Sequence, residues 1–204
     1  MQAREKILRS VDSLETIYAV VVAFAVTKAI EGVLLSGNTA DIDLSLLLTH
    51  LPELIAFVVT IVPFYHGMHR HLNRVYVERG VSKTHQGYLL LDFFVFFVES
   101  CLLLVFAASL SLGVDSFKPL IILLILDSLW AIIAHGIHYD EWKNSPWKWA
   151  AINTVSIAVM ALFIFSTIFD SEFKKIMALM SVAIIRTALD YIFCWPFYFP
   201  NEDS

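Results

Sequence analysis

The sequence contains six apolar segments that are each long enough to cross a membrane as a helix. A spanning helix needs about 20 mostly apolar residues, because the hydrocarbon core of a bilayer is about 30 Å thick. The predicted spans are approximately 14–35, 52–71, 86–113, 117–139, 146–169 and 173–195. We therefore expect an all-α integral membrane protein with six transmembrane helices in one bundle.

The composition agrees with a membrane protein. Hydrophobic residues make up 58% of the 204 residues and charged residues only 16%, whereas soluble domains carry about 25% charged residues. The mean hydropathy is +0.72. With a net charge of −5 the chain has no domain-wide basic surface, so we expect no nucleic-acid partner. Because no linker or low-complexity stretch divides the chain, residues 1–204 are predicted to form one transmembrane domain.

The distribution of Lys and Arg predicts that both termini lie in the cytoplasm. Six spans place the two termini and the connections after the second and fourth spans on the same side. That side carries nine basic residues: Arg4, Lys6, Arg9, Arg70, Arg74, Arg79, Lys83, Lys143 and Lys148. The opposite side carries three: Lys118, Lys174 and Lys175. Since cytoplasmic loops are enriched in basic residues, we expect a multi-pass protein, typical of a bacterial inner membrane, with an N-in/C-in topology.

Two histidine motifs close apolar segments and predict a candidate site. The sequence HGMHRH at 66–71 is echoed by HGIHYD at 135–140. A spacing of three residues places two helical side chains about 60° apart, so each motif can present two imidazoles to one ion. The predicted ligands are His66, His69, His135, His138 and Asp92. This donor set suits a divalent transition metal such as Zn²⁺, Fe²⁺ or Mn²⁺, or a proton. An interfacial hydrogen-bonding role for these histidines is the alternative, and His71 is expected to be solvated.

The charged residues inside the spans are unbalanced. Two bases face five acids: Lys28 and Arg186 against Glu31, Asp92, Glu99, Asp127 and Asp190. Lys28 with Glu31, and Arg186 with Asp190, form predicted pairs at helical spacing. Asp92, Glu99 and Asp127 are left without a basic partner, and an isolated charge in hydrocarbon costs several kcal/mol. Each must be protonated, hydrated, paired with a histidine or bound to a cation. For Arg186 and Asp190 a purely structural ion pair is the alternative.

These residues favour three functions. The first is a small membrane protein with a buried His/acid site, open to the cytoplasm, that binds a cation or relays protons. The second is a non-enzymatic subunit, such as a sensor, anchor or pore component of a stress or phage-defence assembly, that docks a soluble cytoplasmic protein. The third is a metal-dependent membrane enzyme acting on a lipid-soluble substrate. Membrane lipid is the expected surrounding partner, a homo-oligomer is the expected assembly, and a divalent transition metal is the only cofactor considered.

The topology makes a direct prediction. Cysteines introduced at Ala40 and Gly80, in a background without Cys101 and Cys194, should differ in their access to an impermeant thiol reagent applied to intact cells. Position 40 should react because it follows the first span on the outer side, and position 80 should not. Reaction at position 80 alone would reverse the orientation.

Overall fold

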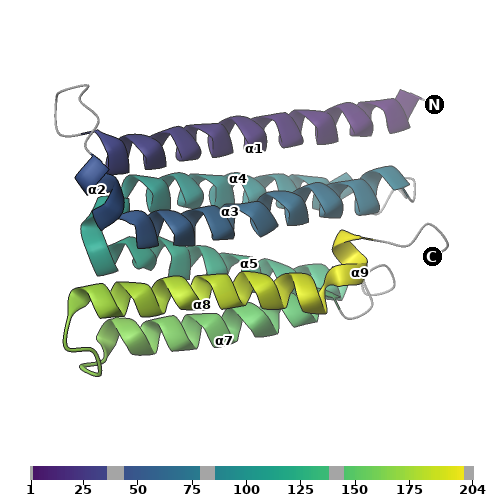
Figure 1. Ribbon diagram of the computed structural model, residues 1–204. Coiled ribbons are helices and arrows are strands. Elements are labelled where there is room, and N and C mark those ends of the chain that lie inside the picture. The colour runs from purple at the N-terminus through teal and green to yellow at the C-terminus, as the bar shows by residue number, and fades with distance from the viewer. Residues whose placement is uncertain (1, 36–43, 79–85, 138–144, 200–204) are drawn as a thin grey trace.

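The computed structural model describes residues 2–35, 44–78, 86–137 and 145–199, and nearly all of these are helical (Figure 1). Six helices are long and apolar enough to span a membrane: α1 (Gln2–Leu34), α3 (Leu51–Leu72), α4 (Gln86–Ala108), α5 (Phe117–Ile137), α7 (Ser145–Phe165) and α8 (Glu172–Phe193). The short elements are α2 (Leu44–Thr49), the π-helical η1 (Asn73–Glu78), the 3₁₀-helical η3 (Leu110–Ser116) and α9 (Trp195–Tyr198). The predicted all-helical chain with six membrane-length apolar helices is confirmed.

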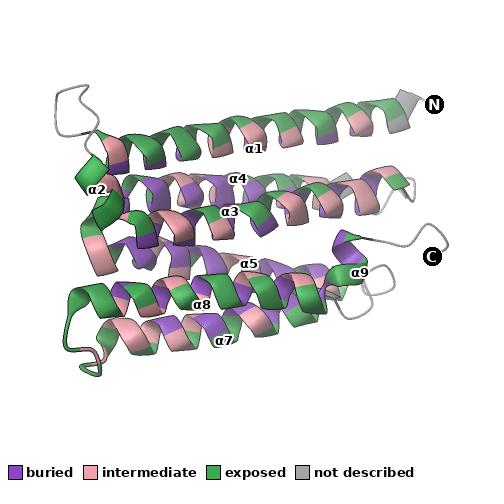
Figure 2. Cartoon of the chain, in the orientation of Figure 1, coloured by how far each residue is buried: buried purple, intermediate pink, exposed green. Residues whose placement is uncertain are grey.

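The six long helices form a closed ring. Helix α1 packs against α4, followed in order by α5, α7, α8 and α3, which returns to α1. Buried residues occupy the inward faces of the helices and exposed residues the outward faces (Figure 2). The core includes Phe57, Leu103 and Phe106. Large apolar residues such as Phe94 and Phe165 are exposed on the outside. An outer surface of this kind fits contact with lipid, and the chain is a multi-pass membrane protein by this pattern.

Several helix boundaries differ from those predicted from hydrophobicity. Helix α1 begins at Gln2 instead of residue 14, because the polar residues before the apolar segment also form helical turns. Arg9 Nη2 lies 2.7 Å from Glu5 Oε1 there, one helical turn away. Past α3, residues 73–78 continue as the π-helix η1. The connection predicted over residues 72–85 is therefore helical in its first half, and its remainder lies outside the described residues.

A proline inside α3 is compensated by a side chain from α8. Pro63 has no N–H, so the carbonyl of Val59, one turn earlier, loses its helical donor. The hydroxyl of Thr187 donates to that carbonyl oxygen at 2.8 Å. Within a membrane a free backbone carbonyl costs several kcal/mol. The bond therefore satisfies α3 and also fixes its height against α8.

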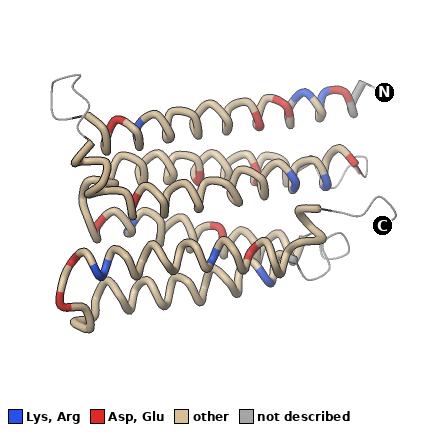
Figure 3. Tube along the Cα trace, viewed as in Figure 1, with Lys and Arg blue, Asp and Glu red and all other residues tan. Residues whose placement is uncertain are grey.

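The two termini lie at the same end of the bundle, as an even number of spans requires (Figure 1). Lys and Arg lie mainly towards the two ends, while acidic residues also occur along the length of the helices (Figure 3). The cytoplasmic location of the terminal end remains a prediction from the basic-residue count.

The turn between α4 and α5 depends on a glycine. Gly113 in η3 has a φ of +62°, which side-chain-bearing residues rarely adopt. A Cβ there would also collide with Glu172 Oε1 at the start of α8. The same carboxylate oxygen accepts a hydrogen bond from the Val114 N–H at 3.3 Å. Gly113 thus lets the turn approach α8.

We expect Gly113→Ala to lower the free energy of unfolding by about 1–3 kcal/mol, because of the backbone strain and the lost contact with Glu172. Thermal unfolding in detergent micelles measures the change. Gly32→Ala is the matched control, since a Cβ at Gly32 meets no atom within 4 Å. Equal effects of the two substitutions would show that the turn does not need glycine.

Candidate functional site

The three histidines of the first motif point to three different neighbours. His66 faces α8 and α9: its Nδ1 lies 3.3 Å from the Tyr191 hydroxyl, and its ring centroid is 4.8 Å from that of Tyr198. His69 faces α1, where its Nδ1 lies 3.1 Å from Glu15 Oε1 in a partly exposed pair. Both positions agree with the angular separation of helical residues.

His71 is fully buried, so the expectation that it is solvated is wrong. Its exposed fraction is 0%, and its Nε2 lies 2.6 Å from Asp92 Oδ2 on α4. Because an ionised carboxylate only accepts hydrogen bonds, this nitrogen is the donor. Asp92 also accepts from the Tyr76 hydroxyl at 2.8 Å and from Trp130 Nε1 at 3.0 Å. A histidine thus supplies the partner that Asp92 lacked in the sequence.

The second motif contributes less to the described structure. His135 is partly buried near the end of α5, with its ring centroid 6.5 Å from that of Trp147. His138 lies outside the described residues. Among the residues that the structure describes, no three His, Cys, Asp or Glu side chains gather closely enough to hold a metal ion. The expected histidine cluster is therefore not found in this part of the chain, and a five-ligand site that includes His138 stays a prediction.

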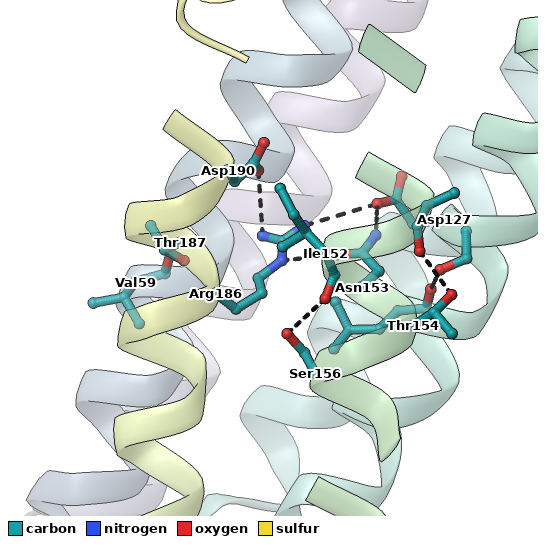
Figure 4. Close-up of polar contacts among 12 residues, drawn as sticks. Val59, Asp127, Ile152, Asn153, Thr154, Ser156, Arg186, Thr187 and Asp190 are labelled. Atoms are coloured by element: carbon teal, nitrogen blue, oxygen red, sulfur yellow. Dashed lines mark hydrogen bonds and ion pairs between the residues drawn. The ribbon is translucent and has the colours of Figure 1, made fainter. Parts of the chain in front are cut away.

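A second cluster of polar side chains surrounds Arg186 on α8 (Figure 4). The Arg186 Nη1 lies 3.6 Å from Asp190 Oδ2, one turn along the same helix, as predicted. Its Nη2 lies 3.8 Å from Asp127 Oδ2 on α5. Its Nε donates to the side-chain oxygen of Asn153 on α7 at 2.9 Å. The Asn153 amide nitrogen in turn donates to Asp127 Oδ2 at 2.6 Å. One guanidinium therefore joins α5, α7 and α8.

Asp190 has a further partner from the end of the chain. The Tyr198 hydroxyl on α9 donates to Asp190 Oδ2 at 3.1 Å. Tyr198 and Phe197 are both buried, with exposed fractions of 3% and 1%. The end of the chain thus places these two aromatic side chains against its own bundle.

Glu99 has no ion-pair partner among the described residues. It lies on α4, seven residues after Asp92, with an exposed fraction of 1%. Its Oε1 makes no hydrogen bond. Glu99 lines a cavity of about 30 Å³. The other walls carry Asp127, Arg186 and Asp190 together with Phe64, Phe96, Trp130, Trp149 and Tyr198.

We call Glu99, Asp127, Asn153, Arg186 and Asp190 the polar centre. It contains three carboxyl groups and one guanidinium in the interior of the bundle. The predicted Lys28–Glu31 pair also forms, with Lys28 Nζ 3.2 Å from Glu31 Oε2. That pair is about half exposed on α1 and lies apart from the polar centre.

Sequence reasoning missed Tyr76, Trp130 and Tyr198, the neutral donors to the buried acids. Their hydroxyl and indole groups carry no charge, so a count of the charged residues inside the spans does not include them. The available signal was the demand of Asp92 and Asp190 for donors. It did not indicate which of the many aromatic residues would meet that demand.

The buried and exposed histidines of α3 make a matched test. We expect His71→Ala to lower the free energy of unfolding by about 3–5 kcal/mol, because it leaves the buried carboxylate of Asp92 without its His71 partner. His69→Ala removes a partly exposed pair and should cost at most about 1 kcal/mol. Denaturant unfolding in detergent measures both values. Similar costs would contradict the burial of the His71–Asp92 pair.

The sequence matches no protein-family model, and neither the curated proteins nor the solved structures contain a significant match to it. The chemistry of the polar centre is therefore the basis on which its function is inferred.

Proposed function

We propose that this protein binds protons at the polar centre, within the membrane, and relays them to and from one end of the bundle. The observation that carries the proposal is Glu99, a fully buried carboxyl group without a hydrogen-bond partner for Oε1. Such a group is stable in an apolar interior when it is neutral, which means that it holds a proton.

The charges around Glu99 support proton binding. With all three carboxyl groups ionised, the single positive charge of Arg186 would leave the polar centre with an excess of two negative charges. Asp127 and Asp190 already share Arg186, so the guanidinium offers little to Glu99. A buried, unpaired charge costs several kcal/mol in the membrane. Uptake of a proton removes that cost, and loss of the proton restores it. The fraction of molecules that hold the proton therefore changes with pH.

The size of the cavity favours a proton over larger ligands. A volume of about 30 Å³ holds about one water molecule and no organic substrate. Calcium needs about six to eight oxygen ligands. The described residues offer no group of three ligands for a transition metal. A water molecule at the centre could carry a proton between Glu99 and the acids near Arg186.

The aromatic wall gives the site its selectivity. Phe96 and Trp130 line the cavity beside Glu99 and keep its surroundings apolar. A hydrated Na⁺ or K⁺ would have to shed most of its water there. A proton needs only a hydrogen-bonded path, which side chains and one water can supply.

Glu99→Gln tests the function. Infrared titration of the purified protein should show the carbonyl band of a protonated, buried carboxyl group in the wild type, and the substitution should remove it. After a rapid drop in pH, wild-type protein should take up protons from a weakly buffered solution that contains a pH-indicator dye, with the rate reduced at least about a hundredfold by Glu99→Gln.

Glu31→Gln is the matched control. It makes the same chemical change in a half-exposed pair on α1, and should leave both the band and the rate unchanged. A band and a rate that survive Glu99→Gln would exclude Glu99 as the proton-binding group.

A further inference from the structure

Helix α9 lies at the end of the bundle where the termini lie (Figure 1), and its Tyr198 lines the same cavity as Glu99. Helix α9 and the residue after it fold over the ends of α3 and α8. Arg70 Nε on α3 donates to the Phe197 carbonyl at 3.3 Å. The Phe197 ring meets the Trp149 ring edge-on, with centroids 4.5 Å apart. These two contacts hold α9 in a defined position over the centre.

Tyr198 spans the distance between the centre and the surface. Its hydroxyl donates to Asp190, whose exposed fraction is 2%. Its ring lies against His66, with centroids 4.8 Å apart, and His66 is only partly buried. No other described tyrosine hydroxyl bonds to an acid of the polar centre.

The backbone of α3 makes room for this hydroxyl. A Cβ placed on Gly67, the residue after His66, would lie 3.6 Å from the Tyr198 hydroxyl oxygen. A larger side chain at this position would fill the space that the phenol group occupies. The H-G sequence of the first motif therefore combines an imidazole with a gap beside it, into which the tyrosine of the chain end fits.

The imidazole is oriented by a second tyrosine. The Tyr191 hydroxyl lies 3.3 Å from His66 Nδ1, and the Tyr191 and Tyr198 ring centroids are 4.6 Å apart. A hydrogen bond to one ring nitrogen sets the orientation and tautomer of the other. Burial raises the pKa of the Tyr198 phenol well above its usual value. Its hydroxyl therefore stays neutral and can accept a proton only while it gives one away.

We propose that His66 and Tyr198 form the route by which protons reach the polar centre. This inference rests on the proposed proton-binding function. A protonated His66 gives its proton to the Tyr198 oxygen through one water molecule, while Tyr198 gives its own proton to the Asp190 carboxylate. His66 and Tyr198 end neutral, and Asp190 ends as the neutral acid. The reverse sequence releases the proton.

The test separates the rate of protonation from its extent. After a rapid drop in pH, time-resolved infrared spectroscopy follows the growth of the protonated carboxyl band. Tyr198→Phe keeps the ring and removes the hydroxyl, and should slow that growth about a hundredfold. The final amplitude should match the wild type, because the carboxyl groups of the centre are unchanged. Tyr65→Phe is the control, since the Tyr65 ring contacts Tyr18 on α1 instead.

His66→Ala should slow protonation similarly, and free imidazole in the buffer should restore the rate. The buffer should leave Tyr198→Phe slow, because that defect lies deeper in the route. His69→Ala, which alters the side chain that faces α1, should behave like the wild type. A structural defect would not be repaired by imidazole, so rescue identifies proton transfer.

The position of α9 over the bundle end is checked with Cys194, the buried residue before α9. Burial raises the pKa of this thiol to about 12, so a maleimide should label it slowly while α9 stays in the position described here. In a Cys101→Ala background, equal labelling of the wild type and Tyr198→Phe would show that only the hydroxyl was lost. Fast labelling of Tyr198→Phe would show that the substitution displaces α9, and this displacement would then explain a slower growth of the carboxyl band. In that case the rate of His66→Ala, with and without imidazole, decides whether the route exists.

The outcomes are distinct. If the wild type shows no protonation of Glu99, the proposed function fails and the route fails with it. If the wild type is protonated and both Tyr198→Phe and His66→Ala keep the wild-type rate, the function stands and the route is overturned. A slow His66→Ala that imidazole does not restore would also overturn the route.

Discussion

The interior of the bundle depends on Arg186. A buried guanidinium is costly unless its donors are satisfied, and this one contacts Asp127, Asn153 and Asp190. These partners come from α5, α7 and α8, so a single side chain joins half of the helical ring. The same group has too little charge to neutralise every acid around it. Stability and the proposed proton binding therefore have one origin, which is a positive charge shared among more carboxyl groups than it can pair.

The rule that each polar group in an apolar interior needs a partner explains the rest of the architecture. Pro63 frees the Val59 carbonyl, and Thr187 supplies the missing donor. Asp92 collects three donors from three different elements. Glu99 differs from Asp92, because it is buried with an unbonded oxygen and has no ion pair among the described residues. Its lack of a partner is a local departure from the rule and marks the place where function is expected.

The first histidine motif shows how a short sequence can serve three separate purposes. Consecutive helical residues are rotated by about 100°, so His71 lies about 140° from His66 and about 160° from His69, whereas His66 and His69 are about 60° apart. His66 contacts α9, His69 contacts α1 and His71 contacts α4. His71 belongs to the structural pair with Asp92, His69 to a partly exposed contact, and His66 to the aromatic group around Tyr198. In the described part of the chain, these three histidines therefore do not share one set of contacts.

Length and apolarity alone determine the six helices, because a bilayer accepts only hydrogen-bonded segments of about 20 residues. Pairs within one helix, such as Lys28–Glu31 and Arg186–Asp190, also follow from the sequence, since residues three and four apart share a face. The partners of Asp92 and Asp127 were decided by the tertiary structure, because they come from other helices. His71 shows why. The apolar segment ends near it, which suggested exposure, but the helix continues through η1 and carries His71 inside the ring. Hydrophobicity marks where a helix enters lipid, whereas only packing decides which helix faces each side chain.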